Sequence, residues 1–151
     1  MPNIRHAKWL LLVFALFFID QSCTGARNRQ PPREYVNSIE DIKAVADKAF
    51  DEGDFASAGK TYNVLLKKHS CFTGFVQRLS FDRAYLNTKL SHCKKSLSTQ
   101  GFQEYRKGNL GEAVAAWRSL LAIDPDNASV KEVIRTATLQ QKNLQKLTAG
   151  R

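Results

Sequence analysis

The sequence predicts an all-α fold, and two observations support that prediction. Beyond residue 38 of the 151-residue chain, apolar residues recur three and four positions apart, the spacing that places side chains on one face of a helix. In addition, a set of helix-ending and small residues in the segment 101–127 returns 55 positions upstream. Everything after residue 38 is therefore expected to be helix or loop.

The segment 101–127 predicts two antiparallel helices joined by a tight turn. Gly108 can adopt the left-handed conformation that ends the first helix. Asn109 follows as a cap for the second helix, and Glu112 stands three residues on, where it can reach back to the cap. This order of residues is typical of a helical hairpin.

The residues after the turn predict how the two helices pack. Ala113 is small enough to allow close approach, and Trp117 and Leu120 follow it at i+4 and i+7, on the same face. Pro125 prevents the second helix from continuing. The hairpin is thus expected to be filled by Trp117 and to end before Pro125.

A shift of 55 residues superimposes an upstream hairpin on this one. The matched residues are Ile42 with Leu97, Ala46 with Gly101, Phe50 with Tyr105, Gly53 with Gly108, Asp54 with Asn109, Phe55 with Leu110, Ala58 with Ala113, Tyr62 with Trp117 and Leu65 with Leu120. The pattern resembles the tetratricopeptide repeat (TPR), a helix-turn-helix unit of roughly 34 residues. Because the period exceeds that unit by about 21 residues, the resemblance implies two TPR-like antiparallel hairpins with an insertion between them.

Five segments are expected to be helical, namely 39–52, 55–68, 81–107, 110–123 and 128–147. Ser38 and Ser80 are the expected caps of the first and third helices. The third helix is elongated, because helical spacing continues unbroken through Leu86, Leu90, Cys93 and Leu97. The last helix is expected to cap the stack with one apolar side, made of Val130, Val133, Ile134, Ala137, Leu144 and Leu147.

This pattern divides the chain into one helical domain and two preceding segments. Residues 1–22 form the expected signal peptide, and residues 23–38 the expected lipid-anchor and tether segment. The domain covers 39–147 and consists of repeat 1 at about 39–70, an insertion at about 71–93, repeat 2 at about 94–127 and the capping helix at 128–147.

The N-terminal residues predict export. Arg5 and Lys8 precede an unbroken apolar run from Trp9 to Ile19, which is too short for a bilayer core that needs about 20 residues. Cys23 follows closely, in an arrangement that resembles the lipid-attachment cysteine of a bacterial lipoprotein.

Other outcomes for the N-terminus remain open. Asp20 and Gln21 depart from the residues that a lipoprotein signal has before its cysteine, and cleavage after Ala26 would release an unlipidated chain. An uncleaved anchor is the third alternative. In the segment 23–38, Pro31 and Pro32 and the lack of a helical period predict a flexible tether.

The cysteines allow two interpretations. If Cys23 carries lipid, Cys71 and Cys93 remain as a pair in an oxidising compartment, where a disulfide would contribute about 3 kcal/mol. Alternatively, Cys93 is a small buried thiol in the apolar stripe between Leu90 and Leu97.

No motif predicts an enzyme. The chain lacks a glycine-rich phosphate loop, a nucleophile elbow and a His-Glu-x-x-His pair, so no catalytic residue is assigned. We expect no cofactor and no metal ion, because the spacing of His69, Cys71, His92 and Cys93 matches no zinc site. The net charge of +9 favours anionic lipid or an acidic envelope partner, and we expect no nucleic acid in an exported chain.

The TPR resemblance implies a surface that docks a peptide or protein. In TPR proteins the first helix of each hairpin lines a concave groove, and the corresponding positions here are Glu40, Lys43, Asp47 and Phe50, then Lys95, Ser98, Phe102 and Tyr105. Aromatic rings beside cations suit an acidic or aromatic segment. The predicted partner-binding residues are therefore Lys43, Phe50, Lys95, Phe102 and Tyr105, with packing between helices as the alternative for Phe50 and Tyr105.

These features predict a protein–protein interaction adaptor of the bacterial cell envelope. Its partner would be another envelope protein or peptide. It would be a lipoprotein facing the periplasm and anchored through Cys23, or else a soluble periplasmic or secreted protein. Two alternatives are a structural subunit of an envelope or secretion assembly and an accessory subunit of a cell-wall enzyme. The oligomeric state stays open, because two repeats fall short of the three or so that usually suffice.

Overall fold

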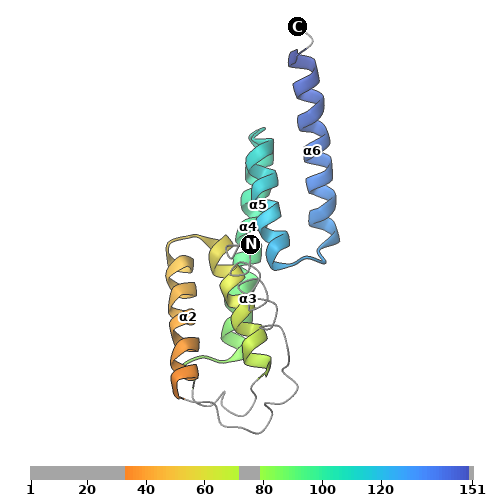
Figure 1. Cartoon of the computed structure of the whole chain (residues 1–151). Helices are drawn as coiled ribbons and strands as arrows, with labels where there is room; N and C mark the ends of the chain where they lie inside the picture. Colours follow the sequence, from red (N-terminus) through yellow and green to blue (C-terminus); the bar gives the residue numbers. More distant parts are fainter. Residues whose placement is uncertain (1–32, 72–78, 150–151) are drawn as a thin grey trace, which may run out of the picture.

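A computed structural model describes residues 33–71 and 79–149, and within them the chain is all-helical. The helices are α2 (Arg33–Asp51), α3 (Phe55–Cys71), α4 (Arg83–Arg106), α5 (Leu110–Ile123) and α6 (Ala128–Ala149). Consecutive helices run in alternating directions, and the long α4 joins the α2–α3 pair to the α5–α6 pair (Figure 1). The predicted all-α class is confirmed, and the third helix is long, as predicted, with 24 residues.

The first helix begins earlier than predicted, at Arg33 instead of residue 39. Ser38 lies inside this helix, where its hydroxyl donates to the carbonyl of Tyr35 at 2.9 Å, so its predicted role as a cap is wrong. The cause is apolar packing: Tyr35 packs on the core and Ile39 is buried, so this turn of helix is held by tertiary contacts. The part of the tether segment before residue 33 lies outside the described residues.

The start of α4 also differs from the prediction. The cap is Asp82, whose Oδ1 accepts a hydrogen bond from the backbone N–H of Tyr85 at 2.7 Å. Ser80, the predicted cap, instead donates from its backbone N–H and its hydroxyl to the Glu40 carboxylate, at 2.6 and 2.7 Å. This pair of bonds ties the entrance of α4 to α2.

The α2–α3 and α4–α5 turns share one backbone geometry. Gly53 and Gly108 have φ of +80° and +83°, the left-handed region that favours glycine. In each turn the N–H of the glycine and of the next residue donate back to the carbonyls of the ending helix, as in a Schellman motif. The bonds are Gly53 to Phe50 and Asp54 to Ala49, then Gly108 to Tyr105 and Asn109 to Glu104.

Asn109 does not cap α5 through its side chain, although it stands at the cap position. Its amide Nδ2 donates to the carboxylate of Glu104 at 2.7 Å, and Lys107 binds the same carboxylate at 2.6 Å. This bond from the amide to a charged carboxylate is strong and orients the Asn109 side chain toward Glu104, and its Oδ1 accepts no bond from the first turn of α5. The predicted reciprocal cap of Asn109 and Glu112 is therefore wrong.

The predicted packing between α4 and α5 is confirmed. Ala113, Trp117 and Leu120 are 0, 1 and 2% exposed and belong to one continuous core. Gly101 on α4 makes room for the indole, since a Cβ atom at this position would overlap Nε1 of Trp117. The close approach of the two helices thus depends on a missing side chain at Gly101 as well as on the small Ala113.

Only the first half of α6 acts as the predicted cap. Val130 and Ala137 are buried, whereas Leu144 and Leu147 are 50 and 70% exposed. Figure 1 shows that α6 extends beyond the α4–α5 turn, so the last turns of the helix, which carry Leu144 and Leu147, have no neighbouring helix among the described residues. The expectation that Leu144 and Leu147 cover the stack is wrong for this reason.

Candidate functional site

The residues of α2 that the TPR resemblance assigns to a groove contact other parts of the protein itself. Asp47 accepts hydrogen bonds from Tyr62 and Tyr85, both at 2.6 Å, and forms an ion pair with Lys43 at 2.7 Å. Lys43 also lies over the rings of Phe81 and Tyr85, 5.9 and 5.1 Å from their centres. This polar cluster joins α2, α3 and α4.

The cluster shifts the acid–base behaviour of its members. Burial by itself would raise the pKa of Asp47, but the hydrogen bonds from Lys43, Tyr62 and Tyr85 outweigh it and lower that pKa below its ordinary value. Burial, together with the bond to Asp47, raises the pKa of Tyr62. The carboxylate therefore stays charged and the two phenols stay protonated at neutral pH.

Phe50 packs between helices as well. Its ring makes edge contacts with Phe55 and Tyr62, and its centre lies 5.0 Å from that of the exposed His92. The ammonium group of Lys89 lies 3.7 Å from the ring centre, a close cation–π contact. The structure therefore does not bring the predicted partner-binding residues Lys43 and Phe50 to an open surface.

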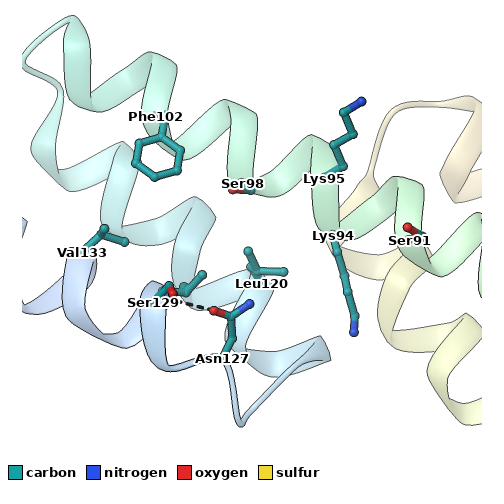
Figure 2. A pocket seen from close by; sticks show the side chains of 10 residues that line it. Ser91, Lys94, Lys95, Ser98, Phe102, Leu120, Asn127, Ser129 and Val133 are labelled. Atoms are coloured by element: carbon teal, nitrogen blue, oxygen red, sulfur yellow. Dashed lines mark hydrogen bonds between the residues drawn. The ribbon is translucent and has the colours of Figure 1, made fainter.

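The equivalent positions on α4 line an open cavity of ≈ 460 Å³ between α4, α5 and α6. Figure 2 shows side chains from the three helices around it. Lys95, Ser98 and Phe102, which the sequence assigned to the groove, are all part of its lining. The lining residues are Ser91, Lys94, Lys95, Ser98 and Phe102 of α4, Leu120 of α5, Asn127 before α6, and Ser129, Val130 and Val133 of α6.

One end of this cavity is polar and cationic. Lys94 forms an ion pair with Asp124 at 3.1 Å. Asn127 caps α6, because its Oδ1 accepts from the N–H of Val130 at 3.1 Å. Lys95 is exposed and forms no ion pair with any carboxylate of the described residues. Figure 2 shows its ammonium group pointing outward from α4, so this positive charge lies at the outer edge of the cavity, and Lys95 also lines a second hollow beside the α2–α3 turn.

The other end is apolar. The side chain of Phe102 is 46% exposed and contacts Trp117 edge to face, with ring centres 5.2 Å apart. Val133 faces the same end of the cavity in Figure 2. A half-exposed aromatic ring held in place by a buried indole is a suitable anchor point for an apolar side chain.

Tyr105 does not line this cavity. Its hydroxyl donates to Oε1 of Gln140 at 2.9 Å, and its ring centre lies 5.9 Å from that of Trp117. The residue therefore links α4 to α6, which agrees with the alternative of packing between helices.

The sequence did not identify the α6 side of the cavity. Ser129 and Val133 were seen only as parts of a capping helix, because the position of α6 relative to α4 depends on the turn after α5. A second hollow of ≈ 530 Å³ beside the α2–α3 turn was also missed; it is lined by Gly53, Phe55, His92, Lys95, Ser96, Thr99, Gln100 and Gln103.

Cys93 is a free thiol with no exposed surface. Burial raises its pKa to about 11, so it is protonated and unreactive at neutral pH. This agrees with the alternative of a small buried thiol between Leu90 and Leu97, whereas the predicted bond to Cys71 is not formed at Cys93. The side chain of Cys71 itself is not among those described. The lipid-attachment residue Cys23 and the signal segment 1–22 also lie outside the described residues.

Among residues 33–71 and 79–149, no three His, Cys, Asp or Glu side chains are grouped as a metal ion would require. Nor does any helix in these ranges combine the length and apolar character needed to cross a bilayer. Comparison with protein-family models, with curated proteins and with solved structures found no match.

Proposed function

We propose that the protein is a TPR-like adaptor of the bacterial cell envelope, without catalytic activity of its own, that docks a segment of another protein. The observation that carries this proposal is the open cavity between α4 and α6, which has the half-exposed Phe102 at one end and the unpaired Lys95 at the rim of the other. Such a combination of apolar ring and cation is what a docking surface needs for affinity and specificity.

The assignment to a TPR-like architecture is supported by the two turns. Gly53 and Gly108 lie 55 residues apart and have the same left-handed φ and the same hydrogen bonds. Each turn is followed by a helix with a small buried residue, Ala58 or Ala113, and then a buried aromatic residue. Two hairpins built on one template fit a repeat protein whose first helices present the docking face.

The proposed attachment to the membrane rests on the N-terminal sequence. A lipid on Cys23 and the following proline-containing segment would restrict the domain to a membrane surface. That restriction raises the effective concentration of the domain toward partners on the same surface. A docking site of low affinity would then be sufficient to hold the partner.

Site-specific photo-crosslinking in cells tests the docking role. A photoreactive residue replaces Ser98, which lines the cavity, or Ser119 on α5, which does not, in the otherwise unchanged full chain. We expect a discrete protein adduct from position 98, weakened by Phe102→Ser, and none from position 119. Equal adducts from both positions would contradict docking in the cavity.

Intact mass and membrane fractionation test the anchor, with Cys23→Ser as the control. We expect a chain that starts at Cys23 with a diacylglycerol-sized increment and a membrane location that the variant loses. A chain starting near Arg27 without lipid would make the protein a soluble secreted module, and one retaining Met1 would contradict export.

A second candidate function is a structural subunit of an envelope assembly. It is favoured by Leu144 and Leu147, which continue the apolar side of α6 beyond its contact with α5 and are exposed. A second copy of the chain would cover them by pairing the two α6 ends. Light scattering decides this: a dimer that Leu144→Lys converts to a monomer supports the assembly, and a monomeric native chain rejects it.

A further inference from the structure

We infer that the cavity between α4 and α6 binds an internal acidic segment of a partner protein. In this segment a carboxylate and a large apolar side chain are about three residues apart. The carboxylate pairs with Lys95 and the apolar side chain packs on Phe102. This inference deepens the proposed docking function and rests on it, because it specifies the chemistry and the spacing of the occupant.

Charge selects the acidic class of segment. Two lysines and no carboxylate are found among the ten residues that line the cavity. Asp124 holds Lys94 at 3.1 Å, and both side chains of this pair are about one third exposed. The pair leaves the neighbouring Lys95 as the cation that an incoming carboxylate can neutralise. A basic segment would meet the like charge of Lys95 at this end, where the Asp124 carboxylate is already paired with Lys94.

The apolar end selects a large side chain. Phe102 presents nearly half of its surface, while its contact with Trp117 fixes the orientation of the ring. Leu120, Val130 and Val133 complete an apolar wall on α5 and α6. An aromatic or branched aliphatic side chain that covers this surface would remove apolar area from water on both partners.

The geometry of α4 sets the distance between the two contacts. Lys95 and Phe102 are seven positions apart on one helix, which corresponds to about 10 Å along its axis. An extended chain advances about 3.3 Å per residue, and a polyproline II chain places every third side chain on the same side. Ser98 lies between the two contacts in Figure 2 and offers a hydroxyl to the backbone of the bound segment.

The lining does not favour a terminal carboxylate over an internal one. The amide oxygen of Asn127 is already used to cap α6, and Lys94 is already paired with Asp124. Lys95 alone therefore provides a single, flexible point of charge, which suits a side-chain carboxylate within a longer segment.

Selection from a random peptide display library on the immobilised full chain tests the inference. Two variants alter residues that line the cavity, Lys95→Glu and Phe102→Ser, and they are called the groove variants. Their matched controls are Lys142→Glu and Leu139→Ser on α6, which make the same kinds of change at exposed positions outside the cavity; Leu139 is 49% exposed, close to the 46% of Phe102. Thermal melts of all four variants establish that each is folded.

We expect the native chain to enrich peptides with Asp or Glu two to four positions from an aromatic or large aliphatic residue. This spacing matches the rise of about 10 Å along α4 between Lys95 and Phe102. Each groove variant should weaken binding of a selected peptide about tenfold or more, and neither control should do so.

Other outcomes overturn the inference in distinguishable ways. Neutral or basic peptides that still depend on Lys95 and Phe102 would reject the acidic segment but leave the docking function intact. Acidic peptides whose binding survives both groove variants would reject the cavity as their site, and with it the docking function. Enrichment of no peptide, with phosphatidylglycerol vesicles bound and then lost on Lys95→Glu, would replace the protein segment by a lipid surface.

Discussion

The two hairpins, α2–α3 and α4–α5, share a turn geometry but use their outward faces differently. Position 47 of the first hairpin corresponds to position 102 of the second. The Asp47 carboxylate accepts a hydrogen bond from Tyr85 of α4, the helix that follows the first hairpin. The apolar side chain of Phe102 instead remains half exposed. At this position of the helix, a hydrogen-bonded carboxylate therefore accompanies the covered face of the first hairpin, and an aromatic ring accompanies the open face of the second.

The helix that follows each hairpin completes the contrast. The chain entering α4 brings Ser80 onto Glu40 of α2, and it brings Phe81 and Tyr85 into the cluster around Lys43 and Asp47. At the equivalent place α6 brings the shorter side chains of Ser129 and Val133, which leave the cavity unfilled. The comparison teaches that the second hairpin keeps an open face because the lining side chains from its successor helix are short and not aromatic.

The buried aromatic residue of each hairpin provides the largest test. Trp117→Ala should cost about 3–5 kcal/mol of unfolding free energy, because it leaves a cavity in the core between α4 and α5. The matched variant Tyr62→Ala removes a smaller ring but also breaks the hydrogen bond to Asp47, so its cost should approach that of Trp117→Ala. Urea denaturation of both variants measures the two costs, and an unchanged urea midpoint for Trp117→Ala would contradict the packing of the second hairpin.

The equivalent pairs Ala46–Tyr62 and Gly101–Trp117 test how the small residue of each hairpin fits its buried aromatic residue. Gly101→Ala would gain about 1 kcal/mol of helix propensity at an open position. Here the new methyl group overlaps the indole, so we expect a net loss of about 1–3 kcal/mol. Adding Trp117→Tyr, which recreates the residue pair of the first hairpin, should recover part of that loss in a double-mutant cycle of denaturation experiments.

The reverse substitution is the control for that cycle. Ala46→Gly should lose only the helix propensity of about 1 kcal/mol and any packing of one methyl group. A cycle with no coupling between positions 101 and 117 would mean that the glycine does not serve to admit the tryptophan.

The sequence predicted the second hairpin well because its signals are local. Gly108, Ala113 and Trp117 act through the conformation of one turn and the packing of two adjacent helices. The predicted boundaries of the four helices that follow α2 agree with the structure within a few residues for the same reason. On α4, Lys95, Ser98 and Phe102 were correctly grouped because residues three, four and seven apart share a helix face.

The features that were missed depend on contacts far apart in the chain. The Asp47 cluster unites residues 38 positions apart, and a carboxylate with two tyrosines has no sequence signature. The start of α2 was placed too late because Tyr35 is stabilised by packing instead of by a capping residue. The α6 wall of the cavity depends on the angle at which α6 leaves α5, which no local pattern specifies.

The Asp47 cluster on the covered face of the first hairpin predicts that stability depends on pH there, and the second hairpin should lack this dependence. Asp47 has a folded-state pKa below its ordinary value, so its stabilising effect is present above the unfolded pKa of about 3.9. That effect is lost as the pH falls through the lower folded pKa. We expect Asp47→Asn to cost about 2 kcal/mol at pH 7 and much less at pH 3.

Denaturation of native and Asp47→Asn chains from pH 7 to pH 3 measures this effect. Tyr85→Phe should cost about 1 kcal/mol and should reduce the pH dependence without removing it, because Tyr62 and Lys43 still bind the carboxylate. A difference between native and Asp47→Asn chains that stays constant with pH would reject the charged form of Asp47 as the stabilising species.

The smallest expected effect tests what the two hairpins share. Nothing lies within 4 Å of a Cβ atom built on Gly53 or on Gly108, so alanine at either position meets no steric obstacle and pays only for its left-handed backbone. Gly53→Ala and Gly108→Ala should therefore each lower the free energy of unfolding by about 1 kcal/mol, and the two losses should be nearly equal. Unequal losses in matched denaturation curves would show that the turns differ energetically despite their common hydrogen bonds. Equal losses would place the whole difference between the hairpins in the side chains that cover their faces.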